Sequence, residues 1–305
     1  MRQYYHVCIS SHEEVLFRDK EDYIRAFNNL AIAALETGSS LLADAEMSDH
    51  IHTVSASAAI GEMIFKYRTA QTRYFNARYH RTGRLGEKEY FLTELKGARR
   101  ICAATTYTIR NGLHHGVATT PFEYEFCSAN CIFAKDLGKG NDAMPMLPKK
   151  EMYRFLPSHQ KLPDGYTMDQ NGLILRKNVI DCHFVEQLYV TPRNFLFQMN
   201  RYSGEEWAAE QMKEDNGTAP VTLETFEDKQ CDLSKMLSNE KGRINIDRLR
   251  DLELCAIIDS RLVPRCGYAT VYEVPLSIRR DWGNALFMQY GRRTAIKQLK
   301  RCLII

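Results

Sequence analysis

Two histidines separated by one residue, His50 and His52, are the first side chains in this sequence whose spacing suggests chemistry. On a strand, both imidazoles would project from one face and Ile51 from the other. No cysteine lies close by in the sequence, so an open Mg²⁺ or Mn²⁺ site completed by oxygen ligands and a substrate phosphate is favoured over a zinc cage. The pair alone is a weak signal, because two histidines on an exposed strand face also occur without a ligand.

A tyrosine and an asparagine four positions apart, Tyr107 and Asn111, form the second candidate. On a helix they share one face. A phenol ionises at about pH 10, so Tyr107 needs help to act as a nucleophile, and a metal ion that polarises a phosphate can supply it. Asn111 can offer its amide oxygen as a third ligand. The alternative is that Tyr107 is a buried helix aromatic and Asn111 a capping residue.

The elements that would position these residues follow from the spacing of apolar residues. Alternation predicts strands, and a spacing of three or four predicts helices. The expected order is strand 3–10, helix 19–37, strands 39–47 and 50–55, helix 57–80, strand 89–93 and helix 94–111. Asp19 is the predicted N-cap of the first helix, Gly38 its stop, and Ser48-Asp49 the turn of a hairpin. This order predicts an α+β fold: a split βαβ, ferredoxin-like antiparallel sheet with helices on one face and one added helix.

The second half of the chain is predicted to be mostly helical. Residues 133–148 are rich in Gly, Lys, Asp, Met and Pro without a regular period, which places a domain boundary there. We therefore predict a first domain at 1–132, an extended connection at 133–178 and a helical domain at 179–305. Helices are expected at 179–199, 204–214, 228–237, 246–262 and 277–303. The last one is basic, and the sequence leaves open whether it binds DNA or is a packing appendage.

The charge distribution adds candidate nucleic-acid contacts. The formal net charge of +3 is too small to indicate a nucleic-acid partner, but basic residues far outnumber acidic ones between Lys66 and Arg110. Such a cluster is either a phosphate-binding surface or a solvated helix face. The candidate contacts to DNA phosphates are Arg73, Arg78, Arg81, Arg84 and Arg110.

The composition excludes several classes of protein. With 44% hydrophobic and 26% charged residues, the chain is typical of a globular protein and unlike disordered or collagen-like sequences. Its nine cysteines form no C-x-x-C pair and are expected to be reduced thiols. No apolar run approaches the roughly 20 residues of a membrane span, and the start of the chain lacks the apolar core of a signal peptide. We expect a cytoplasmic protein without a membrane partner.

Several short motifs follow one another over about the first 130 residues. They are Tyr5-His6-Val7, Leu16-Phe17, Glu21-Asp22-Tyr23, Met47-Ser48-Asp49-His50-Ile51-His52, Tyr107-Thr108-Ile109-Arg110-Asn111, and a tail with Gly116-Val117, Pro121 and Tyr124. Together they resemble the motifs of the single-tyrosine HUH transposases, and more narrowly of the REP-associated tyrosine transposases. Several motifs in the right order are much more specific than any one of them.

The resemblance implies a function and a set of roles. His50, His52 and Asn111 would be ligands of a divalent metal, Mg²⁺ or Mn²⁺. Tyr107 would attack a DNA phosphate, forming a 5′-phosphotyrosine and freeing a 3′-hydroxyl, without a nucleotide cofactor. The implied activity is that of a transposase, or DNA strand transferase, acting on single-stranded or hairpin DNA. Members of this class include monomers and dimers, so a homodimer is an open alternative.

Three positions depart from the family pattern, and two rival functions remain. Ser48 and Asp49 stand where the family has Pro-Asn, and Gly112 stands where it has a proline after the asparagine. The first rival is a domesticated nucleic-acid-binding protein that keeps the fold and has lost the cutting. The second is a metal hydrolase that uses the histidines with water as the nucleophile.

Overall fold

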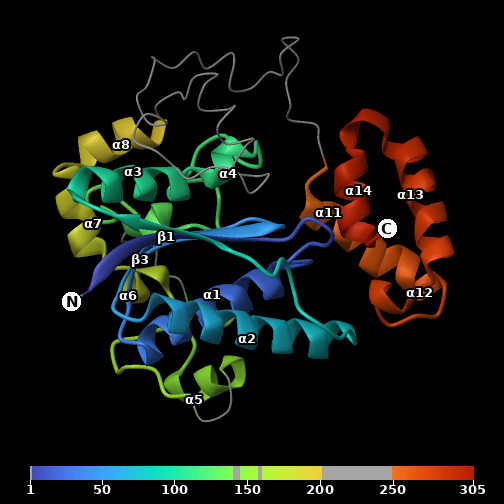
Figure 1. The fold of residues 1–305 in the computed structure, drawn as a ribbon, viewed down its shortest axis with the longest axis horizontal. Coiled ribbons are helices and arrows are strands. Elements are labelled where there is room, and N and C mark those ends of the chain that lie inside the picture. The colour runs from blue at the N-terminus through green and yellow to red at the C-terminus, as the bar shows by residue number, and fades with distance from the viewer. Residues whose placement is uncertain (1, 140–144, 157–159, 201–248) are drawn as a thin grey trace.

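The computed structural model describes residues 2–139, 145–156, 160–200 and 249–305. The predicted helices 204–214 and 228–237 lie outside these ranges. A four-stranded antiparallel sheet forms the centre of the described structure, with helices on both of its faces and a group of C-terminal helices at one end (Figure 1). The prediction of an α+β fold built on an antiparallel sheet is confirmed.

The sheet has the strand order β2-β3-β1-β4, and each neighbouring pair of strands is antiparallel. Its strands are β1 (Gln3–Ser10), β2 (Ser40–Glu46), β3 (His50–Ser57) and β4 (Phe91–Leu95). The predicted strands agree with these bounds to within about two residues. The predicted turn at Ser48-Asp49 is confirmed, since the Met47 amide donates to the His50 carbonyl at 2.7 Å and closes the β2–β3 hairpin.

Two long helices, α1 (Lys20–Glu36) and α2 (Ile60–Tyr79), cover one face of the sheet. As predicted, the Asp19 side chain caps α1 by accepting from the Asp22 amide at 3.1 Å. Gly38 follows the end of α1 with a φ of +61°, a conformation that glycine adopts without strain. The apolar cluster on this face includes Val7, Ile9 and Ile51 from the strands and Leu30, Met63 and Ile64 from the helices.

The opposite face of the sheet is covered by α3 (Ala98–Ile109), so the prediction of helices on one face is wrong for this helix. Figure 1 shows α1 and α2 on one side of the sheet and α3 on the other. The reason is that β3 also buries the side chains that point away from α1 and α2, among them His52 and Val54. A strand that is buried on both faces needs a second covering layer, and α3 supplies it.

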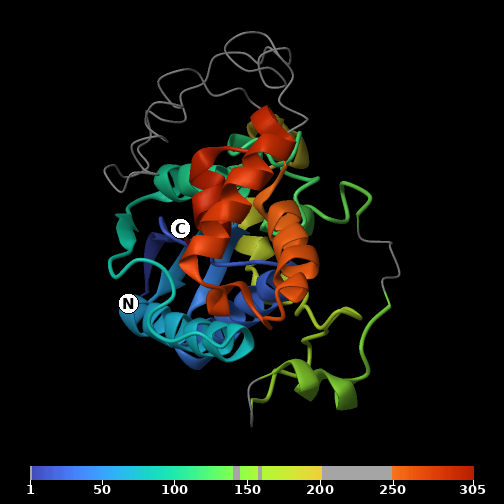
Figure 2. The ribbon, with the colours of Figure 1, turned by 90° about the vertical axis from the view of Figure 1, so that its right-hand side faces the viewer.

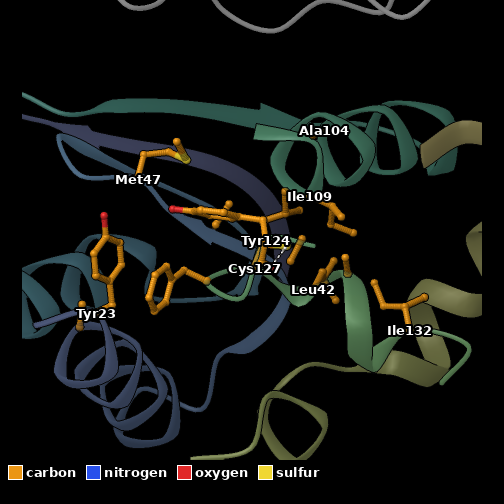
Figure 3. Packing of buried hydrophobic residues seen from close by; sticks show 14 of the residues in the cluster. Tyr23, Leu42, Met47, Ala104, Ile109, Tyr124, Cys127 and Ile132 are labelled. Carbon is orange, nitrogen blue, oxygen red and sulfur yellow. Dashed lines mark hydrogen bonds between the residues drawn. The ribbon is translucent and has the colours of Figure 1, made fainter. Parts of the chain in front are cut away.

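The predicted helix 94–111 is shorter than expected and ends in a bend. α3 stops at Ile109, and the single turn α4 (Asn111–His114) follows Arg110, so Asn111 begins a new helix and does not close the first one. The chain beyond α4 packs against α3 in a second apolar cluster, which includes Ala104, Ile109, Tyr124 and Cys127. Figure 3 shows Tyr124 in the middle of this cluster, with Ile109 and Cys127 beside it.

The predicted extended connection, 133–178, contains short helices and is packed against the rest of the chain. Its helices are α5 (Lys149–Met152) and α6 (Arg176–Val179). Met168 and Ile174 pack against Phe27 and Ala31 of α1. In addition, the buried Arg176 guanidinium donates to Asp44 at 2.8 Å and to Glu46 at 2.7 Å, which fixes α6 beneath β2.

The predicted helix 179–199 is two helices, α7 (Cys182–Tyr189) and α8 (Pro192–Asn200). They are separated at Val190, whose φ of +68° is incompatible with a continuous helix. Both helices contact α3, and the hydroxyls of Tyr189 and Thr106 lie 2.8 Å apart.

Residues 249–305, the C-terminal module, form a separate apolar cluster that also includes Val15. Figure 2 shows these helices facing the viewer, across the end of the sheet. They are α11 (Asp251–Ile257), a π-helical turn (Ile258–Leu262), α12 (Val263–Arg265), α13 (Leu276–Tyr290) and α14 (Ile296–Leu303). The predicted helix 277–303 is therefore interrupted, at a 3₁₀ turn over Gly291–Arg293. The three predicted domain ranges stay predictions.

None of the helices in the described part of the chain combines the length and apolar character that crossing a membrane requires.

Candidate functional site

The two candidate metal-binding histidines lie side by side on β3, facing α3. His50 and His52 are 6% and 1% exposed, and their ring centroids are 5.1 Å apart with the ring planes nearly perpendicular. The two imidazoles share one face because side chains alternate along a strand. Ile51, between them, points to the other face and joins the α1 and α2 cluster, as predicted.

Tyr107 and Asn111 reach the same place from the last turn of α3 and the first residue of α4. The Tyr107 ring stands perpendicular to the His52 ring at a centroid distance of 5.2 Å. Asn111 Oδ1 lies 2.8 Å from His50 Nε2. The structure therefore brings together all four residues that the sequence nominated as nucleophile and ligands.

Three further histidines complete the cluster, although none of them was among the predicted ligands. His6 Nε2 lies 3.0 Å from His52 Nδ1, and the His6 ring also meets the Tyr107 ring edge-on. The His114 ring lies 5.7 Å from that of Tyr107, and the His115 ring 4.7 Å from that of His50. A signal for His6 existed, since it lies on a central strand with the same alternation as the candidate pair. The positions of His114 and His115 in the cluster depend on the bend at Arg110, and the sequence did not show this bend.

Burial disfavours the charged form of three histidines in the cluster, His6, His52 and His114. Burial lowers the pKa of His52 well below its usual range, and the neighbouring His50 and His6 lower it further. Burial also lowers the pKa of His6 to about 4. The pKa of His114 is well below its usual range, chiefly because of burial and then because of the Arg110 charge. Neutral imidazoles keep a lone pair for a cation, and they are also compatible with a plain buried core.

Two contacts of His50 bear on whether a divalent metal fits here. Asp49 Oδ1 lies 2.8 Å from His50 Nδ1, so Nδ1 donates to this carboxylate. On the other side of the ring, Nε2 lies 2.8 Å from Asn111 Oδ1, a contact that requires a proton on Nε2, a reversed Asn111 amide or a bound cation. The chemistry of two imidazoles and an amide oxygen fits such a cation.

The third ligand would have to be the asparagine. In the ranges that the structure describes, no three His, Cys, Asp or Glu side chains are arranged to hold a metal ion. The Asn111 side chain is fully buried, and within the same ranges its Nδ2 has no hydrogen-bond partner. A buried amide nitrogen without a partner is costly, and exchanging the Oδ1 and Nδ2 positions would let it donate to His50 Nε2.

The three departures from the family motifs have structural explanations. Ser48 Oγ donates to Asp251 Oδ2 at 2.7 Å, and Asp49 is bonded to Arg301, so both turn residues are held by the C-terminal module. A Cβ at Gly112 would lie 2.6 Å from the Tyr124 ring, which leaves no room for a proline or any other side chain.

The surroundings of Asp49, whose side chain is partly exposed, favour its ionised form. Burial alone would raise the pKa of this carboxyl group. The hydrogen bond from His50, the charge of His50 and the charge of Arg301 hold the pKa well below its usual range.

The predicted DNA-binding arginines are not gathered at this cluster. Four of them lie on or just after α2, which covers the other face of the sheet. Arg78 is paired with Asp19 and Asp22, and Arg81 with Glu14, whereas Arg73 and Arg84 are exposed.

Arg110 lies nearer to Tyr107 than the other four but is buried, and it donates to the Gln198 carbonyl at 3.2 Å. The sequence could not show which guanidiniums have carboxylate or carbonyl partners within the chain.

Comparison with known proteins does not identify a family for this chain. No protein-family model matches the chain, and no curated protein matches it. Among solved structures, a REP-associated tyrosine transposase bound to a REP hairpin is similar at a TM-score of 0.37 and 10% identity, covering 45% of this chain and 81% of that one. A likeness of this size establishes neither a fold nor a function for the present chain.

Proposed function

We propose that the chain is a metal-dependent DNA strand transferase that cleaves and rejoins single-stranded or hairpin DNA through Tyr107. In this proposal the sheet is the ferredoxin-like sheet of the HUH transposases, with His50, His52 and Asn111 as metal ligands. One observation carries the proposal. Residues separated by 61 positions, His50 and Asn111, meet at 2.8 Å, and Tyr107 stands against the ring of His52.

The covalent step is an exchange of phosphoesters. The Tyr107 oxygen forms a bond to phosphorus while the bond from phosphorus to the 3′ oxygen breaks. The phenol proton leaves, and the departing 3′ oxygen takes up a proton to become a hydroxyl. Rejoining is the reverse reaction with a second 3′-hydroxyl. A bound Mg²⁺ or Mn²⁺ would polarise the phosphate and stabilise the developing charge.

The residues around Tyr107 have roles that this geometry supports. The face of α3 holds the phenol against His52 and His6, so the nucleophile is oriented before DNA binds. Burial lowers the pKa of both imidazoles beside the phenol, so they are weak proton acceptors and orient the phenol rather than deprotonate it. Asp49 holds the His50 ring by its Nδ1, which directs Nε2 toward Asn111.

The proposed function requires that a DNA phosphate can reach Tyr107. Tyr107 is 1% exposed and Asn111 is fully buried, so a phosphate cannot reach the phenol in this conformation. The side chains of α4 and the residue after it, His114 and His115, cover the cluster on one side. DNA binding must therefore displace part of this cover, a movement of the kind that gates many active sites.

The same burial favours a second candidate, a nucleic-acid-binding protein that no longer cuts. Five histidine rings and a tyrosine ring in mutual contact make a well-packed core. In that case the cluster stabilises the fold, and any DNA binds elsewhere on the surface.

One experiment separates the candidates. The protein is incubated with end-labelled hairpin DNA and Mn²⁺ and run on a denaturing gel, beside Tyr107→Phe and the matched control Tyr189→Phe, another fully buried tyrosine. A covalent adduct that only Tyr107→Phe abolishes supports the transferase. Hairpin binding without an adduct supports the second candidate, and product release without dependence on Tyr107 indicates hydrolysis by water.

A further inference from the structure

The C-terminal module carries an excess of positive charge that the rest of the chain lacks. Residues 249–305 contain ten Lys and Arg residues and five Asp and Glu residues, a formal charge of +5. Of the chain's 41 basic and 38 acidic residues, the other 31 and 33 lie in residues 1–248, a formal charge of −2. A charge distribution this uneven points to a polyanionic partner for the basic part of the chain.

Most acidic side chains of the module are used inside the protein. Four of the five are Asp251, bonded to Arg301, Asp259, bonded to Arg18, and Glu253 and Glu273, which accept from backbone amides. The fifth, Asp281, is an exposed residue of α13. Internal bonds therefore occupy most of the negative charge, and the excess of positive charge lies at the surface.

Four exposed basic side chains gather where α14 begins, and we call them the basic edge: Arg250, Arg293, Lys297 and Lys300. The Leu249 amide donates to the Arg293 carbonyl at 2.9 Å. This backbone contact brings the neighbouring Arg250 to the start of α14. In the ranges that the structure describes, no carboxylate is within ion-pair distance of Lys297 or Lys300. The two ammonium groups are therefore available to an external anion.

The basic edge lies next to the candidate site. Arg301, in the same helix, donates to Asp49, the residue before His50. Lys297 is four residues before Arg301, so it lies on the same side of α14, about 6 Å further along the helix. Figure 1 shows α14 on the side of the module that faces the sheet. A DNA strand held at the His50 end of the candidate site would therefore have its neighbouring phosphates close to these lysines.

We propose that the basic edge binds the phosphate backbone of the DNA strand that is presented to Tyr107. The inference rests on the proposed function, because it takes the substrate of Tyr107 as the ligand. Lysine contacts to phosphates position a strand and do not read its bases, so the basic edge contributes affinity and placement, and not sequence recognition. The C-terminal module is then part of the substrate-binding surface, although it supplies no residue that touches the reacting atoms.

The test measures DNA binding separately from cutting. A fluorescently labelled DNA hairpin with a single-stranded tail is titrated in EDTA, and fluorescence anisotropy is recorded at several NaCl concentrations. The double variant Lys297→Gln/Lys300→Gln is expected to bind about 10-fold more weakly at low salt. The slope of log K against log salt concentration should become shallower by about 1.4, because each lost contact to a single-stranded phosphate removes about 0.7.

Arg261→Gln/Arg265→Gln is the matched control. It removes the same charge from two exposed positions of the same module, in the π-helical turn and in α12. Figure 1 shows α12 at the lower end of the module, below α14. This variant should change the affinity by less than about 2-fold. Near-ultraviolet circular dichroism confirms that each variant is folded.

Three results would overturn the inference. The first is a lysine double variant that binds the hairpin as tightly as the wild type does. The second is an equal loss of affinity in the two double variants, which would show that only the net charge matters. The third is polyglutamate that displaces the labelled hairpin as well as unlabelled hairpin DNA does, which would indicate an acidic protein as the partner.

The covalent assay separates this inference from the proposed function. With Mn²⁺ and saturating hairpin DNA, Lys297→Gln/Lys300→Gln should still form the Tyr107 adduct, since neither lysine touches the reacting phosphate. If the wild type binds DNA through the lysines and forms no adduct, the proposed function is wrong and the basic edge remains a DNA-binding surface. If the adduct forms and the lysine variant binds normally, the basic edge is wrong and the proposed function remains.

Discussion

Arg18 and Asp259, which are 241 positions apart in the chain, form a two-point ion pair in which Nε and Nη2 each donate to a carboxylate oxygen at 2.8 Å. Arg18 is 1% exposed, and its Nη1 also donates to the Cys302 carbonyl at 3.0 Å. This guanidinium joins the segment before α1 to two parts of the C-terminal module. The module is therefore fixed to the sheet at Arg18 as well as at Arg301.

Removing this pair should destabilise the protein. Arg18→Met keeps the aliphatic volume but leaves Asp259 without its partner, and we expect the free energy of unfolding to fall by about 2–3 kcal/mol. The measurement is urea unfolding followed by fluorescence. Lys20→Met is the control, because the Lys20–Glu125 pair is more than half exposed and should contribute at most about 1 kcal/mol. Equal losses in the two variants would contradict the buried role of Arg18.

Arg78 should prove to be a stabilising residue. It donates to Asp22, which is fully buried, so Arg78→Ala leaves that carboxylate without its charged partner. We expect the free energy of unfolding to fall by about 2–4 kcal/mol. Arg73→Ala, on an exposed position of the same helix, should change it by less than about 0.5 kcal/mol. If Arg78→Ala is as stable as the wild type and binds hairpin DNA more weakly, Arg78 contacts DNA as the sequence predicted.

Two glycines should respond in opposite directions to alanine. At Gly112 the new Cβ would lie 2.6 Å from the Tyr124 ring, and we expect a loss of about 1–3 kcal/mol. At Gly61 in α2 nothing lies within 4 Å, so alanine should stabilise the helix by roughly 0.5 kcal/mol. Thermal unfolding of both variants checks this. In a Tyr124→Leu background the cost at Gly112 should shrink, and an unchanged cost would rule out the steric explanation.

Glu14 should contribute a pH dependence to stability. Burial raises the pKa of Glu14 above its usual range, although the charge of Arg81 lowers it in part. The unfolded chain then loses the Glu14 proton at a lower pH than the folded protein does. This contribution to stability is present below about pH 4.5 and is lost as the pH rises through the higher folded-state pKa. The free energy of unfolding of the wild type minus that of Glu14→Gln should therefore decrease between pH 5 and pH 8. Urea unfolding at several pH values measures this difference, and an increase with pH would contradict a raised pKa of Glu14.

Much of the sheet could be predicted because its signals are local. The alternation in 3–10 and 50–55, the Asp19 cap and the Ser48-Asp49 turn each depend on a few neighbouring residues. The end of the helix before Arg110 was predicted two residues late, at Asn111, and the breaks at Val190 and Gly291 were missed. Pro192 and Gly291 are local signals for the last two breaks, but the apolar spacing on both sides favoured continuous helices.

The candidate site was predictable in its four principal residues and not in its surroundings. His50 and His52 share a face by strand geometry alone, and Tyr107 and Asn111 are close in sequence. His6 joined them because β1 pairs with β3 in a register that sets it diagonally opposite His52. That register depends on the sheet as a whole.

By itself, the sequence determined the strands, the first helices and the two pairs of residues whose spacing suggested a metal and a nucleophile, because propensity and periodicity act over a few residues. The tertiary structure alone decided the rest. It placed α3 on the face of the sheet that carries His50 and His52, and it buried the histidine cluster. It also paired Arg78 and Arg81 with carboxylates and brought Arg301 to Asp49 across 252 positions. These relationships come from packing between distant segments, and no local pattern encodes which partner a buried charge will find.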